Sequence, residues 1–330
     1  MACRLGDLAR FVDGRLLELE YAENPLHALV PPQLAAPTLL TYVRGRNDAL
    51  RATACGGILT EARHRGALVV GSPAIVVENL ALACARAAEF LPVWRRAQND
   101  AEQSAPDRSA GVFAPGCAVA PDAVVDTGTV IENGASIATG VRIGSYCRIG
   151  AGAVIGEGVS VGNRVRLGAN VVIGTDAFAF VRDGASWRRV PTFGAVAIGD
   201  DVEILAHAVI HAGVFGDTVI GAGCVLDSHV LIGHDAAVGA GTAIAGHTAV
   251  AGAARIGRDC RIGGMAGIGE GVVIADGVTI AAMSMVPTSI TRAGASYAGS
   301  WPAQPRQRWW RQVARLRRAA ARGDGLEQLD

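Results

Sequence analysis

Histidine is concentrated in one part of this sequence of 330 residues. Five of the seven His fall between residues 207 and 247, and one of them, His234, is followed directly by Asp235. A neutral imidazole near its usual pKa could take a proton from an amine or hydroxyl group. The backbone N–H of Gly252 is unobstructed by a side chain and could receive a developing oxyanion. This combination predicts acyl transfer from a thioester, without a Ser or Cys nucleophile.

A strict period of six residues predicts where these groups lie in space. An apolar residue recurs every six positions from Phe113 to Ile173 and, after a break at 177–194, from Ile198 to Val286, with a four-residue insertion near 216–219. A triangular solenoid has this period, because each hexad forms one short parallel strand and a turn. Three hexads make a coil of 18 residues, and neighbouring coils stack about 4.8 Å apart.

The 18-residue coil predicts which residues share a column of the solenoid. Gly252 follows His234 by 18 residues and should lie directly over it. His229 and His247 are also 18 residues apart and should stack on a different face, with His207 one coil below them. A single His at a solenoid corner is usually only a polar turn residue. The density of His around His234 favours a catalytic role instead.

The remaining sequence divides into three parts. Residues 1–108 are expected to form a small N-terminal α/β domain and a linker, residues 109–287 the solenoid, and residues 288–330 a C-terminal helical extension. Strands are predicted at 39–43, 56–60 and 74–78, followed by a helix capped by Asn79, and another helix near Pro305. The net charge is zero, which argues against nucleic-acid binding, but residues 306–322 hold seven Arg and no acid. This segment predicts an acidic partner.

The sequence also predicts a compartment. Its first residues lack the apolar core of a signal peptide. The uncharged stretch 236–254 is too rich in Gly and Ala for a membrane span and keeps the six-residue period. The seven Cys form no CxxC motif and are expected to be reduced packing residues. A cytoplasmic protein without a transmembrane segment is therefore expected.

Several segments resemble the UDP-3-O-acylglucosamine N-acyltransferases of lipid A biosynthesis. They are LTYV near residue 40, AIVVENLALACARAAEFL near residue 80, GTDAFAFVRDGASWRRVPTFG at 174–194, LDSHVLIGHD at 226–235 and YAGSWPAQP near residue 300. The resemblance implies a left-handed parallel β-helix, the hexapeptide-repeat solenoid, that assembles as a homotrimer with each active site between two solenoids. It also implies an acyl chain carried as the phosphopantetheine thioester of acyl carrier protein, a UDP-linked acylated glucosamine whose amine accepts it, and no permanently bound cofactor.

The resemblance assigns three catalytic roles: His234 as general base, Asp227 as the acid that supports it, and Gly252 as backbone oxyanion donor. Other predicted site residues are substrate-binding Tyr42, His229, His247, Phe178 and Phe180, acyl-chain-binding Met283 and Met285, and carrier-binding Arg306, Arg308, Arg311 and Arg315.

This sequence departs from the family pattern at three places. Tyr42 fits one of two aromatics that stack uracil, but the other position holds Asp48. IHAG at 210–213 replaces Ile-Asp-Arg-Gly, and a second active-site His falls on Gly271. Weak uridine recognition is therefore expected.

Two alternative functions use the same residues. A related acyltransferase could act on a different amino-sugar acceptor or take its acyl group from coenzyme A. A zinc-dependent lyase of the carbonic-anhydrase kind would use His229 and His234 as metal ligands. That reading needs a third His about two coils earlier, and the sequence has none between His64 and His207.

Overall fold

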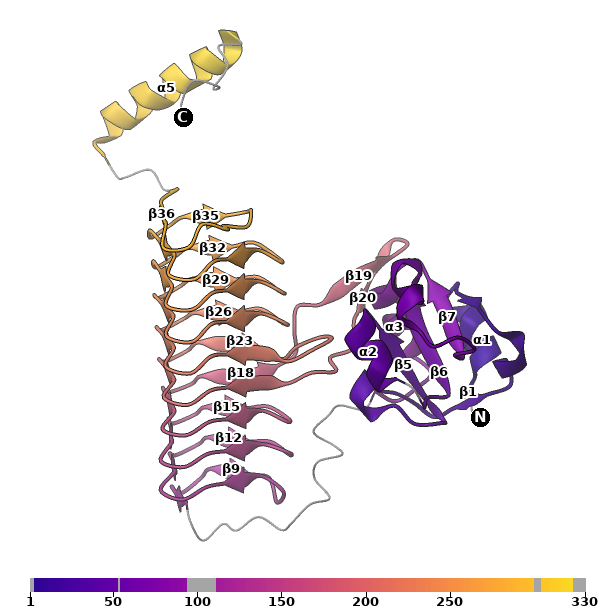
Figure 1. Ribbon diagram of the computed structural model, residues 1–330. Coiled ribbons are helices and arrows are strands. Elements are labelled where there is room, and N and C mark those ends of the chain that lie inside the picture. Colours follow the sequence, from indigo (N-terminus) through magenta and orange to yellow (C-terminus); the bar gives the residue numbers. More distant parts are fainter. Residues whose placement is uncertain (1–2, 53, 94–110, 300–303, 323–330) are drawn as a thin grey trace.

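The computed structural model describes residues 3–52, 54–93, 111–299 and 304–322 (Figure 1). A straight solenoid forms the body of the molecule, and a small N-terminal domain lies beside its middle coils. Helix α5 (Arg306–Arg322) lies beyond the upper end of the solenoid. The predicted linker at 97–110 lies outside the described residues.

The six-residue period forms a three-sided parallel β-helix. Short strands such as β13 (Arg142–Ile143), β14 (Arg148–Ile149) and β15 (Val154–Ile155) occupy successive sides of a coil. Each strand pairs in parallel with the strand one coil away, so that β11 (Val130–Ile131) pairs with β14. The predicted left-handed parallel β-helix is confirmed.

The solenoid has three sheets, which are named here by their strand number. The ten-stranded sheet runs from β8 (Val112–Phe113) to β36 (Ser296–Tyr297), the nine-stranded sheet from β9 (Ala118–Val119) to β35 (Met285–Val286), and the eight-stranded sheet from β10 (Val124–Val125) to β33 (Val273–Ile274). Corner 1 denotes the turns from the ten- to the nine-stranded sheet, and corner 2 the turns from the nine- to the eight-stranded sheet.

Aliphatic side chains fill the interior of the solenoid. Ile131, Ile149 and Ile204 stack in one column and are completely buried. The thiols of Cys147, Cys224 and Cys260 are also buried and unpaired, and burial raises the pKa of each. These cysteines are packing residues, as the sequence predicts.

Two segments leave the solenoid on the side of the N-terminal domain. The first contains the hairpin of β19 (Phe180–Asp183) and β20 (Ser186–Arg189). The second is the loop 212–217, which lies where the sequence shows its four-residue insertion. Both contact the N-terminal domain: Arg86 forms an ion pair with Asp183 of the hairpin at 2.8 Å, and the Tyr42 hydroxyl donates to the Phe215 carbonyl of the loop.

The N-terminal domain has a five-stranded sheet in the order β2 (Arg15–Leu16), β7 (Ala74–Val77), β6 (Gly57–Glu61), β5 (Leu39–Val43), β4 (Ala28–Leu29). Its helices are α1 (Leu5–Phe11), α2 (Arg46–Arg51) and α3 (Leu80–Ala87). The side chain of Asn79 accepts the Leu82 N–H at 3.0 Å, so the predicted helix cap is confirmed. Leu80, Cys84 and Ala87 of α3 are buried, and Leu91, which follows the end of the helix, is buried as well.

Helix α5 begins directly after Pro305, as predicted, and the predicted carrier-binding residues on it, Arg306, Arg308, Arg311 and Arg315, are exposed. Within the described residues, no helix is long and apolar enough to cross a bilayer.

Candidate active site

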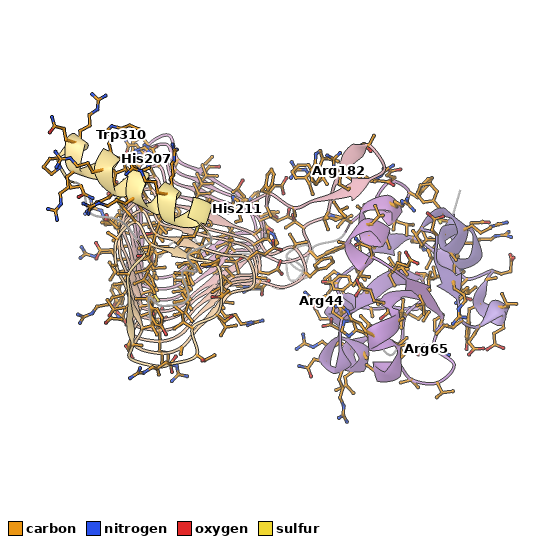
Figure 2. The ribbon with its side chains drawn as sticks, turned by 90° about the horizontal axis from the view of Figure 1, so that it is seen from above. Arg44, Arg65, Arg182, His207, His211 and Trp310 are labelled. Carbon is orange, nitrogen blue, oxygen red and sulfur yellow. The ribbon has the colours of Figure 1, made fainter. Side chains whose placement is uncertain are left out.

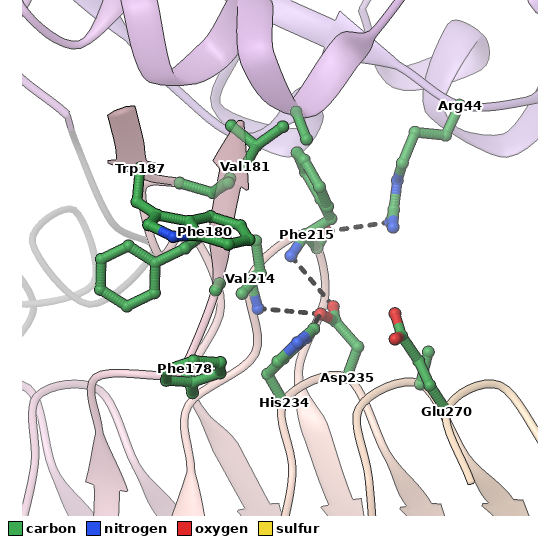
Figure 3. Close-up of a pocket in the computed structure, with 14 residues that line it drawn as sticks. Arg44, Phe178, Phe180, Val181, Trp187, Val214, Phe215, His234, Asp235 and Glu270 are labelled. Carbon is green, nitrogen blue, oxygen red and sulfur yellow. Dashed lines mark hydrogen bonds and ion pairs between the residues drawn. The ribbon is translucent and has the colours of Figure 1, made fainter. Parts of the chain in front are cut away.

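A cavity of about 830 Å³ lies between corner 2 of the solenoid, the hairpin and the N-terminal domain (Figure 3). Its floor comes from corner 2 and includes His234, Asp235 and Glu270. Aromatic side chains form one wall, and the guanidinium of Arg44 reaches it from the N-terminal domain. The cavity therefore places titratable groups beside apolar surface, as binding sites for small molecules commonly do.

His234 and Asp235 form a hydrogen-bonded pair at the floor of this cavity. Nδ1 of His234 lies 2.8 Å from Oδ2 of Asp235, and the two side chains are 22% and 16% exposed. Burial raises the pKa of Asp235, but hydrogen bonds from His234 and from loop amides outweigh it, so the pKa is lowered. A charged Asp235 fixes the proton on Nδ1 and leaves Nε2 to act as a base.

Gly252 lies directly over His234, as the 18-residue spacing predicts. A Cβ atom at position 252 would lie 2.6 Å from Nε2 of His234, so only glycine fits without movement of the ring. Among the described residues, the N–H of Gly252 has no hydrogen-bond acceptor. A free backbone donor and the free nitrogen of a base thus meet at one place, which is the arrangement needed to stabilise an oxyanion.

Within one chain, Asp227 does not contact His234, so its supporting role stays a prediction that only a neighbouring chain could fulfil. Asp227 lies at corner 1, where its carboxylate accepts the N–H of Ser228 at 2.7 Å and that of Gly246 at 2.9 Å. These bonds close the turns of two neighbouring coils. Asp235, the next residue after the base, orients the imidazole instead.

The predicted column of histidines is confirmed at corner 1. The rings of His207 and His229 are 5.1 Å apart and those of His229 and His247 are 4.7 Å apart, each pair nearly parallel. All three side chains are exposed, and His207 lies on the side of the solenoid away from the N-terminal domain (Figure 2). Within one chain, His229 and His247 therefore do not line the cavity, and their substrate-binding role stays a prediction.

The prediction that Tyr42 stacks on the uracil ring of a nucleotide is wrong. Tyr42 is completely buried, and burial raises the pKa of its hydroxyl. Its ring packs against Phe193 and Phe215, with centroids 4.9 and 5.3 Å away. Neither face of the ring is open to a ligand. Asp48, at the other predicted stacking position, instead accepts the backbone N–H of Arg44 at 3.0 Å.

Phe178 and Phe180 line the cavity, as expected of substrate-binding residues. Phe178 is 82% exposed, its ring lies 5.3 Å from that of Phe180, and Trp187 extends the same apolar wall. Met283 and Met285 are exposed at the upper end of the solenoid and do not line this cavity. Their acyl-chain role stays a prediction.

Three cavity residues or neighbours were not predicted as site residues. Glu270 follows Gly252 by 18 residues, so the length of one coil would have predicted its place in the column above Gly252. His211 is partly buried near His234, and burial and the charge of His234 both lower its pKa. Arg44 comes from the other domain, and nothing in the solenoid period points to it.

The structure does not bring together the ligands of the alternative zinc site within the described residues. His229 and His234 project from different corners, and no three His, Cys, Asp or Glu side chains among the described residues are placed to hold one metal ion.

Comparisons with known proteins agree with the repeat and the predicted family. The family description "Bacterial transferase hexapeptide (six repeats)" matches residues 140–175 and 253–288. UDP-3-O-acylglucosamine N-acyltransferase from Ectopseudomonas mendocina is 42% identical over 157 residues, 48% of this chain and 44% of that protein. The enzyme of the same name from Dechloromonas aromatica is 49% identical over 65 residues, 20% of this chain and 19% of that protein.

A UDP-N-acetylglucosamine acyltransferase structure from Campylobacter jejuni is 23% identical over 56% of this chain and 68% of that chain, with a TM-score of 0.45. The chain spans less than half the length of the curated relatives that it matches. The resemblance to the N-acyltransferase family is confirmed over this part.

Proposed function

We propose that this relative of the UDP-3-O-acylglucosamine N-acyltransferases transfers an acyl chain from the phosphopantetheine thioester of acyl carrier protein to the amine of a UDP-linked acylated glucosamine. The observation that carries the proposal is the His234–Asp235 pair beneath Gly252, beside an apolar-walled cavity. Each part has a defined task in acyl transfer.

The reaction begins when Nε2 of His234 takes a proton from the attacking amine. The amine nitrogen bonds to the thioester carbonyl carbon, and the carbonyl oxygen becomes an oxyanion that accepts the free N–H of Gly252. When this intermediate collapses, the carbon–sulfur bond breaks and the thiolate recovers the proton from His234. Asp235 stabilises the imidazolium that exists between these two steps.

The walls of the cavity suit an acylated acceptor. Phe178, Phe180 and Trp187 provide an apolar surface against which a hydrocarbon chain loses contact with water. The guanidinium of Arg44 faces the same space, and a diphosphate is one of the anionic groups that such a fork-shaped donor binds. Chain and nucleotide can therefore be held on either side of His234.

The nine-stranded sheet supports a homotrimer because its outward positions hold no charged residue. They are Ala118, Ser136, Val154, Val172, Val209, Leu231, Ala249, Gly267 and Met285, whereas the other two sheets expose arginines such as Arg148 and Arg255. If three such sheets face one axis, corner 2 of one chain meets corner 1 of the next at the same height. His229 and His247 of a neighbour would then face the cavity.

Helix α5 supplies the site for the carrier. Its exposed arginines suit an acidic partner such as acyl carrier protein, and they lie above the end of the solenoid. We further propose that the reaction takes place in the cytoplasm and uses no bound cofactor other than the thioester of the carrier.

The buried Tyr42 favours a second candidate, a related acyltransferase with a different amino-sugar acceptor or a coenzyme A donor. The uracil-stacking surface that the family resemblance assigns to this residue is absent from the described part of the N-terminal domain.

One experiment tests both candidates. The purified protein is incubated with a panel of acyl carrier and coenzyme A thioesters and amino-sugar nucleotides, and the products are identified by mass spectrometry. Acylated UDP-glucosamine products that disappear in His234→Ala but persist in His64→Ala support the first proposal. Products from another acceptor support the second, and full activity of His234→Ala refutes both.

A further inference from the structure

We infer that the N-terminal domain positions the catalytic base: Tyr42 and Arg44 hold the loop residues 214–216, and this loop fixes Asp235 against His234. The inference rests on the proposed function of His234. It assigns a task to Tyr42, where nucleotide stacking was expected, and to Arg44, which was not a predicted site residue.

The first step of this connection is the carbonyl group of Phe215. It accepts two hydrogen bonds from the N-terminal domain, from the Tyr42 hydroxyl at 2.9 Å and from Nη2 of Arg44 at 3.0 Å. Asp48 in turn restrains Arg44, because its Oδ2 accepts the Arg44 backbone N–H at 3.0 Å and lies 3.5 Å from Nε. The guanidinium also lies over the Phe215 ring, 5.1 Å from its centroid.

The second step is the contact between the backbone N–H groups of the same segment and the Asp235 carboxylate. Asp235 accepts the N–H of Val214 at 3.0 Å and of Phe215 at 3.0 Å (Figure 3). It also accepts the N–H of Gly216 at 2.7 Å. Three consecutive residues thus bind the N-terminal domain through a carbonyl and the catalytic carboxylate through their amides. A displacement of this segment would move all three donors at once.

The third step is the bond from Asp235 to His234 Nδ1 at 2.8 Å. The described hydrogen-bond partners of the Asp235 carboxylate are the three loop amides and this imidazole. The orientation of the carboxylate, and with it that of the base, therefore depends on the loop. A loop that lost its hold would let the carboxylate rotate and would misplace Nε2 relative to Gly252.

The loop does not pack into the core of the solenoid. The buried cluster inside the solenoid is made of residues from its strands and turns, and Val214 and Phe215 belong to the surroundings of the hairpin instead. The loop is also the insertion that interrupts the six-residue period, one coil before His234. An interruption of the repeat next to the base, bonded to both domains, is consistent with a positioning device.

The test is a pair of variants that each remove one buried hydroxyl. Tyr42→Phe removes the donor to Phe215 and keeps the ring that packs against Phe193. Thr60→Val is the control, because the Thr60 hydroxyl is equally buried and donates to the Val43 carbonyl at 2.9 Å, within the same sheet. Both are compared by thermal melting, so that lost folding is not counted as lost activity.

Hydrogen exchange measured by mass spectrometry should show faster exchange of the loop amides 214–216 in Tyr42→Phe and unchanged exchange in Thr60→Val. In the acyl-transfer assay, Tyr42→Phe should lower kcat by about three- to tenfold, the effect of one lost hydrogen bond, with both KM values unchanged. In an Asp235→Asn background the same substitution should have no further effect on kcat, because the connection is already broken.

An unchanged loop in Tyr42→Phe overturns the inference, and so does an equal loss of kcat with and without Asp235→Asn. If Tyr42→Phe does not fold, Arg44→Met is tested by hydrogen exchange of the loop amides alone, because Arg44 is also proposed to bind the diphosphate. The exchange measurement needs no substrate, so failure of the positioning role is distinguished from failure of the proposed reaction, which is read from His234→Ala.

Discussion

Replacement of Gly252 by alanine should abolish most of the activity and leave the fold intact. The added Cβ would lie 2.6 Å from Nε2 of His234, where ordinary contact begins near 3.4 Å. The imidazole must therefore retreat by about 0.8 Å, which strains its 2.8 Å hydrogen bond to Asp235. A misplacement of about 1 Å can reduce a rate by about 10²-fold. The expected loss in kcat is thus about 10²-fold, or about 2.7 kcal/mol in activation free energy.

The backbone gives no reason for Gly252→Ala to unfold the protein. Gly252 is not in the left-handed region, and Ala206 and Ala240 occupy the same position of their hexads in other coils. Gly66→Ala is the control, since it adds a methyl group to an exposed glycine of the N-terminal domain that has no atom within 4 Å of the added carbon and does not line the cavity. Initial rates with a carrier thioester and melting curves are measured for both. A Gly252→Ala enzyme within threefold of the wild-type kcat would refute the placement of the reaction between Nε2 and this glycine.

Three further results are expected. Asp235→Asn should lower kcat by about 10²-fold, whereas Asp227→Asn should lower the melting temperature and leave kcat nearly unchanged; steady-state kinetics that rank them in the opposite order would support Asp227 as the partner of the base. Reversing three exposed charges of α5 should raise the KM for the acyl carrier several-fold and flatten its salt dependence with little change in kcat, and a KM unaffected at low salt would leave α5 without a docking role. The substitutions are Arg308→Glu, Arg311→Glu and Arg315→Glu. The lowered pKa of His211 means that the unfolded chain binds a proton more readily than the folded chain, so this residue should reduce the free energy of unfolding as pH falls below about 6.5. Urea denaturation at several pH values should show a weaker loss in His211→Gln, and an identical loss would contradict the assignment.

The sequence was most informative where one strand pairs in register with the next. In-register pairing turns an 18-residue spacing into a direct stack, so the placement of Gly252 over His234 and of His229 under His247 could be predicted from arithmetic. The same arithmetic places Asp227 one corner before His234, because seven residues are one more than a hexad, so within one chain the two side chains do not meet.

The contribution of the N-terminal domain could not be predicted in this way. Tyr42 and Phe215 are 173 residues apart, and no repeat relates them. Their contact depends on how two separately folded units dock, which is determined by the packing of Tyr42 against Phe193 and by the ion pair of Arg86 with Asp183.

Because every uninterrupted coil has 18 residues, insertion or removal of a whole coil changes the length of the solenoid by one fixed amount. Removal of one whole coil joins two coils whose strands already match. Removal of one or two hexads moves the later strands to another side of the solenoid, and removal of a number of residues that is not a multiple of six turns apolar side chains outward. About two complete coils lie between Gly252 and the end of the repeat, and loss of one would bring α5 closer to the cavity by about 4.8 Å without altering its walls. Duplication or deletion of a single coil can thus change the distance between α5 and the cavity during evolution. The sequences of α5 and of the cavity residues need not change.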